Sequence, residues 1–227
     1  MRVVVLIAAS VLVAACSSSE PGDAGRSDQV PPTSTRSSAP TSTKTTDPVP
    51  TTAPAAGAAI AEVIRWIEAG TPADVSRYHS AVRDGVTTQI DPDVAFVSPS
   101  GKTNCMTDTR FGGALACLVD LTDPPPQPAD VYGQWKGGWV DFEGPSVEIG
   151  SAHGDPGRFG NGTGPELPYG QTLSFGDYRC RADQTGTYCV NYAHQSAVRF
   201  VDSGIETFGC LVRVTPPPSD VGEKFSC

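Results

Sequence analysis

The sequence predicts an α+β fold in which an N-terminal helical hairpin packs on a small antiparallel β-sheet or barrel stapled by disulfides. Three observations favour this fold class. Apolar residues recur at helical spacing between residues 57 and 85. After residue 86, short apolar stretches alternate with Gly- and Pro-containing turns, which is typical of antiparallel strands. Six cysteines lie between residues 105 and 227 and suit a disulfide framework.

The first helix is expected to begin near residue 57. Ile60, Val63 and Ile67 recur at intervals of three and four residues, so they would share one helix face. Gly70 is placed to end the helix.

A second helix is expected directly after Gly70. Thr71 would cap its N-terminus, Pro72 suits a first helical turn, and Gly85 would end it. Its apolar stripe would consist of Val75, Tyr78 and Val82. The two helices together form the predicted hairpin, and His79 is interpreted as a partly exposed helix residue.

The rest of the chain predicts short strands. The stretch DVAFVSPSGKTNCMTD (93–108) indicates two strands around a turn at 98–101, and ALACLVDL (114–121) a third. Later strands are expected at 138–142, 171–175, 178–182, 187–192 and 197–201. The stretches 121–138 and 150–170 are expected to be surface loops. Trp135 and Trp139 would either close one side of a small core, the favoured interpretation, or form an exposed aromatic binding face.

The N-terminus indicates export. Arg2 precedes an apolar run, VVVLIAASVLVAA, that is too short to span a bilayer and fits a signal peptide over residues 1–15. The small residues before Cys16 resemble a bacterial lipobox, which implies that Cys16 carries the lipid and begins the mature protein. An ordinary secretory signal followed by an incidental cysteine is the alternative. Acyl chains at about 0.8 kcal/mol per buried CH₂ would hold the protein on a membrane.

Residues 16–56 read as a lipidated, disordered tether. Ser, Thr and Pro fill 23 of the 40 positions from 17 to 56, which leaves too little apolar surface to offset chain entropy. The globular, extracytoplasmic domain is therefore expected to span residues 57–227.

Removing Cys16 from the seven cysteines leaves an even number for disulfides. The disulfide cysteines would be Cys105, Cys117, Cys180, Cys189, Cys210 and Cys227. Six cysteines allow fifteen pairings. We favour sequential pairs, because each such pair flanks a plausible turn between short strands. We expect no metal and no other cofactor, since the close cysteine pairs of a zinc site do not occur in the sequence.

Four short motifs occur in order: FVSPSGKTNC (96–105), LPYG (167–170), YRC ending at Cys180, and GTYCVN (186–191). Together they resemble an uncharacterised domain of secreted actinobacterial proteins that include mycobacterial lipoproteins. The resemblance covers roughly residues 94–210. It implies a small disulfide-bonded β domain in the cell envelope, without implying an activity.

We assign no catalytic residue from the sequence. The sharpest catalytic hypothesis places His153 and Asp155 near a serine such as Ser98 or Ser151, but we favour a flexible polar loop, which explains the same residues without any chemistry. A formal net charge of −9 argues against nucleic-acid binding and against contact with anionic phospholipid apart from the lipid anchor.

The sequence is compatible with two classes of function. The first is a membrane-anchored, non-enzymatic envelope lipoprotein that binds a protein, glycan or lipid partner. The second is an envelope hydrolase of wall glycan, peptide or lipid, with His153 or His194 as its base. They differ in geometry, because a hydrolase needs a nucleophile within hydrogen-bond reach of a histidine in a cleft.

Overall fold

The computed structural model describes residues 50–153 and 156–227. The predicted signal peptide, the lipid-bearing Cys16 and most of the predicted tether lie outside these residues. Within them the protein is mostly β, with one α-helix and three sheets. This finding corrects the predicted α+β fold with its helical hairpin.

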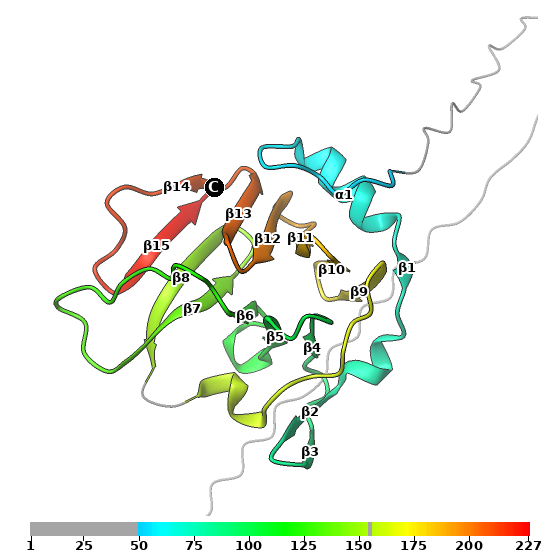
Figure 1. The fold of residues 1–227 in the computed structure, drawn as a ribbon, viewed down its shortest axis with the longest axis horizontal. Helices are drawn as coiled ribbons and strands as arrows, with labels where there is room; N and C mark the ends of the chain where they lie inside the picture. The colour runs from blue at the N-terminus through cyan, green and yellow to red at the C-terminus, as the bar shows by residue number, and fades with distance from the viewer. Residues whose placement is uncertain (1–49, 154–155) are drawn as a thin grey trace, which may run out of the picture. The chain divides into compact units, whose positions relative to one another are not determined.

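Two large sheets carry the fold (Figure 1). The strands of the six-stranded sheet are, in spatial order, β1 (Thr71–Pro72), β9 (Gln171–Phe175), β10 (Tyr178–Asp183), β11 (Gly186–Asn191), β12 (Ser196–Val201) and β13 (Gly204–Gly209). Those of the seven-stranded sheet are β14 (Val212–Arg213), β15 (Val221–Ser226), β8 (Ser146–His153), β7 (Gln134–Phe142), β6 (Leu115–Val119), β5 (Thr103–Thr107) and β4 (Ala95–Val97). Neighbouring strands are antiparallel except for β1 and β9, which pair in parallel.

The main core lies between the two sheets, because it contains buried side chains from both. Val140 and Phe142 on β7 meet Tyr178 on β10 and Phe200 on β12 in one cluster. Side chains alternate between the faces of a strand. Trp139 therefore leaves this core and joins a second cluster on the outer face of the seven-stranded sheet.

The first helix is confirmed as α1 (Ile60–Glu68). It packs on the outer face of the six-stranded sheet, where Val63, Trp66 and Ile67 contact side chains of β11, β12 and β13. Figure 1 shows α1 beside these strands. The predicted apolar stripe thus faces the sheet, although the helix has no helical partner.

The prediction of a second helix between Thr71 and Gly85 is wrong. Residues 71–72 form the parallel strand β1, Val75–Tyr78 is a short 3₁₀ helix, and Asp74 caps it by accepting the Ser76 backbone N–H at 3.1 Å. The strands β2 (Ser80–Arg83) and β3 (Val86–Gln89) then form a hairpin. Asp84 and Gly85 connect them with φ angles of 52° and 78°. Positive φ at both central residues matches the type I′ turn that Asp-Gly favours.

The strands predicted between residues 93 and 201 are present, but the two predicted loops are shorter than expected. Residues 134–137 extend β7, and residues 150–153 extend β8. The strands β8, β13, β14 and β15 were not predicted from the sequence. None of the helices in the described part of the chain is long and apolar enough to cross a membrane.

The disulfide pairs are the sequential ones that the spacing favoured: Cys105–Cys117, Cys180–Cys189 and Cys210–Cys227. The first joins β5 to β6 and the second joins β10 to β11, each between directly opposed residues. The third links the segments that follow β13 and β15. All four cysteines of the first two bridges are fully buried in the main core.

Candidate functional site

A cavity of about 320 Å³ opens on the outer face of the seven-stranded sheet. We call it the Trp139 cavity. Its walls come from the ends of β7 and β8, the 3₁₀ helix η3 (Gly157–Asn161) and the loop that holds the 3₁₀ helix η2 (Thr109–Phe111). The lining residues are Phe111, Ala114, Trp139, Asp141, Glu143, His153, Gly157 and Arg158. A second hollow, of about 330 Å³, adjoins it at Phe111 and Gly157.

Aromatic rings form one wall of the cavity. Trp139 is 4% exposed, and its indole stacks on the His153 ring with centroids 3.6 Å apart. Phe159 of η3 meets the same indole edge-on at 4.8 Å. Trp139 is therefore held between two neighbours, which fixes the plane of the wall.

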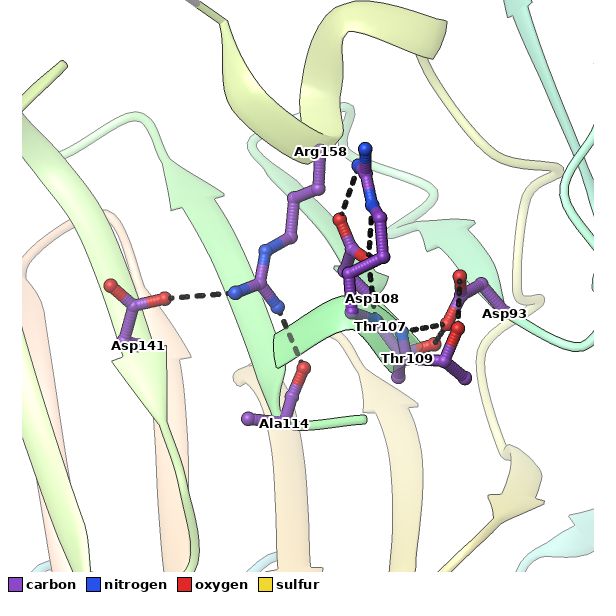
Figure 2. Close-up of polar contacts among 8 residues, drawn as sticks. Asp93, Thr107, Asp108, Thr109, Ala114, Asp141 and Arg158 are labelled. Carbon is purple, nitrogen blue, oxygen red and sulfur yellow. Dashed lines mark hydrogen bonds and ion pairs between the residues drawn. The ribbon is translucent and has the colours of Figure 1, made fainter. Parts of the chain in front are cut away.

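Arg158 and Asp141 are two of the charged residues that line the cavity (Figure 2). The Arg158 Nη1 donates to the Ala114 carbonyl at 2.7 Å, and the side chain is 9% exposed. Its Nη2 lies 3.7 Å from Oδ1 of Asp141, which is longer than a hydrogen bond. The other oxygen, Oδ2, accepts the Trp139 indole N–H at 2.8 Å. A donor and an acceptor thus lie side by side at the cavity wall.

Burial raises the pKa of Asp141, because a carboxylate loses hydration when it is removed from water. The positive charge of Arg158 and the indole hydrogen bond lower the pKa again, without cancelling the effect of burial. The negative charges of Glu148 and Glu143 act in the same direction as burial. Asp141 therefore keeps its proton to a higher pH than a free aspartate does.

Two further aspartates hold the loop that carries Phe111. Asp108, whose side chain is 4% exposed, accepts the Nε and Nη2 hydrogens of Arg110 at 3.0 and 2.6 Å. Asp93 accepts the backbone N–H of Thr109 at 2.8 Å. Figure 2 labels Asp93, Asp108 and Thr109 and marks their polar contacts with dashed lines. The loop places the Phe111 ring 5.6 Å from that guanidinium, so Phe111 forms a lip of the cavity.

The residues of the catalytic hypothesis do not share this cavity. His153 lines it, whereas Ser98 lines a different cavity and Asp155 lies outside the described residues. The Ser98 hydroxyl accepts the Thr103 N–H at 3.2 Å and so belongs to the β4–β5 turn. Ser151 lies two residues before His153 on β8. It is not among the described residues that line the Trp139 cavity.

The other two histidines lie elsewhere. The Nδ1 atom of His79 lies 2.7 Å from the Asp93 carbonyl oxygen, in the segment after η1 where a helix was expected. The His194 backbone N–H donates to the Asn191 side chain at 3.1 Å in the turn between β11 and β12. Neither residue lines the Trp139 cavity as described.

Of the two tryptophans in the aromatic-face hypothesis, Trp139 is buried and Trp135 is half-buried. Trp139 joins the outer cluster of the seven-stranded sheet, and the Trp135 indole donates to the Pro125 carbonyl at 2.8 Å. The interpretation as core closure is confirmed for Trp139, which also forms the cavity wall.

Sequence reasoning missed Asp141 and Arg158. Asp141 follows Trp139 by two residues on a predicted strand, so period-two alternation places both on one face. Nothing local to the sequence links Arg158, inside a predicted loop, to that strand. Across residues 50–153 and 156–227, no group of three His, Cys, Asp or Glu side chains is arranged to hold a metal ion.

Comparison of the chain with protein-family models, with curated proteins and with solved structures gives no match.

Proposed function

We propose that this protein is an actinobacterial-type envelope lipoprotein, anchored through Cys16, whose domain binds a ligand without transforming it. The lipobox-like sequence and the tether composition support the anchor. Three disulfide pairs support an oxidising, extracytoplasmic location. Binding is favoured over hydrolysis because the groups gathered in the Trp139 cavity suit recognition, while Ser98 serves a turn away from His153.

The observation that carries the proposal is the pairing of Arg158 and Asp141. Their facing atoms, Nη2 and Oδ1, lie 3.7 Å apart and offer a donor beside an acceptor. A secondary amide offers the matching acceptor and donor in its C=O and N–H. We infer that the ligand carries a secondary amide whose apolar flank rests against Phe111 or the Trp139–His153 wall.

An acetamido sugar and a peptide bond both present this chemistry. The cavity volume of about 320 Å³ lies at the lower end of small-molecule sites, so it suits one such group rather than a long segment. The lining has two carboxylates, Asp141 and Glu143, against the single Arg158. This balance favours a neutral ligand over an anionic one.

The binding test follows the Trp139 indole N–H resonance of the disulfide-bonded full chain by NMR. N-Acetylglucosamine and N-acetylalanine methylamide are the two amide probes, and glucose is the probe without an amide. At least one amide probe should shift the resonance saturably while glucose does not. The responding amide probe identifies the source of the ligand. Equal shifts with glucose, or no shift with either amide probe, would contradict the proposal.

A matched pair of variants tests the assigned contact. Arg158→Gln should weaken amide binding by roughly ten- to a hundredfold, because it removes a charge-assisted donor worth about 1.5–3 kcal/mol. Arg213→Gln is the control, since Arg213 lies on β14 and pairs with Glu223 at 2.8 Å. Equal affinities of the two variants would count against the role of Arg158.

The anchor has a separate test. Cys16→Ser should move the protein from the membrane fraction into the culture medium and abolish labelling by a fatty-acid analogue. A variant that stays membrane-bound and labelled would disprove the lipid anchor and leave the binding proposal standing.

A further inference from the structure

A second cavity lies where turns of the two large sheets meet, and it shares no lining residue with the Trp139 cavity. Its volume is about 190 Å³. The turn between β4 and β5, the turn between β10 and β11, and the turn between β12 and β13 contribute walls, and Tyr169 contributes from the segment before β9. We call it the hydroxyl cavity. It brings together three sequence motifs, SPSG, LPYG and GTYCVN, that lie far apart along the chain.

Hydrogen bonds and an ion pair fix the walls of the hydroxyl cavity before any ligand arrives. Lys102 and Asp202, one hundred residues apart, form an ion pair between two of the turns. The Asp202 carbonyl also accepts the Thr122 N–H at 2.8 Å. The cavity is therefore preformed, which lowers the entropic cost of binding.

The third wall is fixed by a close approach of backbone. Gly186 has a φ of 138°, and a Cβ atom at this position would lie 2.8 Å from the Phe200 carbonyl oxygen. Phe200 is fully buried and closes the floor of the cavity. A side chain at residue 186 would push these two elements apart.

The groups available to a ligand are neutral and can both donate and accept. They are the Tyr169 hydroxyl, the Gln184 amide and the Ser100 hydroxyl, all on exposed residues. The Ser100 hydroxyl lies 3.0 Å from the Ser98 hydroxyl, and a hydroxyl with one such partner keeps further hydrogen-bonding capacity for a ligand. The charged groups are already engaged. Asp183 accepts from the backbone N–H and hydroxyl of Thr185 at 2.9 and 2.7 Å, and Lys102 pairs with Asp202.

The charge balance excludes an anion as the preferred ligand. One lysine against two aspartates leaves a net negative charge on the lining. The Tyr169 ring, 43% exposed, offers an apolar face at the rim. We propose that the hydroxyl cavity binds an uncharged polyhydroxylated ligand of the size of one sugar ring. The ring hydroxyls would bond Ser100 and Gln184, and an apolar ring face would cover Tyr169. This inference does not depend on the amide site.

The test uses the ¹⁵N-labelled, disulfide-bonded full chain and methyl β-D-glucopyranoside as the probe. We expect saturable shifts of the backbone amides of Ser100, Gln184 and Gly186. Inorganic phosphate, titrated separately, should leave these amides unchanged. Shifts confined to Trp139 and Arg158 would place the probe in the other cavity and overturn the proposal. So would the absence of saturable shifts, or a stronger response to phosphate.

Variants test the assigned contacts. Tyr169→Ala and Gln184→Ala should each weaken the binding of the glucoside by about tenfold, the equivalent of one good contact. Both residues are exposed, so neither truncation opens the core. Tyr132→Ala is the control, because Tyr132 is 90% exposed and lies outside both cavities as described. Unchanged affinity in both test variants would disprove the assignment.

Discussion

The hydroxyl of Tyr178 on β10 donates a hydrogen bond to the carbonyl oxygen of Phe142 on β7, at 2.8 Å. The two rings also meet edge-on with centroids 5.5 Å apart. Because β10 and β7 belong to different sheets, this contact crosses the main core. Its acceptor is a backbone carbonyl one residue after Asp141, so it ties the end of β7 that carries the Trp139 cavity to the opposite sheet.

Tyr178→Phe should destabilise the domain by about 1–3 kcal/mol, the cost of leaving a buried acceptor without its donor. The variant keeps the ring, so packing is unchanged. For a domain of this size, each kcal/mol lowers the melting temperature by about 2–4 °C, which calorimetry resolves. Tyr132→Phe, at an exposed position, should have the same melting temperature as the parent protein. Equal melting of the two variants would mean that the interlayer bond contributes nothing.

Arg158→Gln should raise the pKa of Asp141 further, because the Arg158 charge lowers it in the parent protein. Carboxyl ¹³C chemical shifts followed against pH measure this directly. Arg213→Gln should leave the Asp141 titration where it is, since Arg213 pairs with Glu223 on the neighbouring strand β15. An unmoved titration in Arg158→Gln would show that the guanidinium does not act on this carboxyl.

The raised pKa of Asp141 also predicts a dependence of stability on pH. The folded state binds this proton more tightly than the unfolded state, so the free energy of unfolding falls as pH rises from the ordinary value of 3.8 through the folded pKa. Asp141→Asn should remove that part of the decline. Denaturant unfolding gives the free energy of unfolding of both proteins at each pH in this range. If that free energy falls equally with pH in the parent protein and in Asp141→Asn, the prediction is contradicted.

Gly186→Ala should destabilise the domain more than Gly204→Ala does. Both glycines have φ angles in the region that L residues avoid, at 138° and 152°. Backbone strain of about 1–3 kcal/mol is therefore common to both substitutions. A Cβ at residue 186 also meets the Phe200 carbonyl oxygen, whereas one at residue 204 meets nothing within 4 Å. Urea unfolding compares the two variants. Equal midpoints would show that the β10–β11 turn accommodates the Cβ at residue 186 without loss of stability, and would contradict the prediction.

Removing the Cys105–Cys117 bridge with paired alanines should cost about 3 kcal/mol in the chain-entropy model, because the bridge closes a loop with a sequence separation of 12. Loss of the buried sulfur atoms should add to this cost, since both cysteines are fully buried. Full reduction should lower the melting temperature for the same reason. A melting curve that reductant leaves in place would show that the core is sufficient without its bridges.

Several parts of the fold followed from the sequence because their signals are local. The α1 stripe of Val63 and Ile67 obeys the helical period, and the cysteine pairs lie on neighbouring strands with short connections. The second helix failed because the same residues fit two patterns. Tyr78 and Val82 have helical spacing, yet Asp84-Gly85 between SAVR and VTTQ is a strong hairpin signal. Here turn chemistry outweighed periodicity.

The candidate site was harder to predict because its parts come from distant segments. Trp139 and His153 were named from the sequence, but their stacking depends on the pairing of β7 with β8. The end of β8 contains Gly150, Ser151 and Ala152, which resemble a loop more than a strand. Arg158 enters only through the placement of η3 over the sheet, and no local pattern encodes that placement.

The two buried cross-strand bridges have a consequence for how this chain folds. Cys105 opposes Cys117, and Cys180 opposes Cys189, at matching positions of adjacent strands. A slip of one residue in either hairpin would send one cysteine of the pair to the opposite face of its sheet. Oxidation to the native bridge then becomes impossible until the strands realign. Each of these two disulfides can therefore form only when its strands are paired in the native register, so oxidation selects the correctly aligned hairpin.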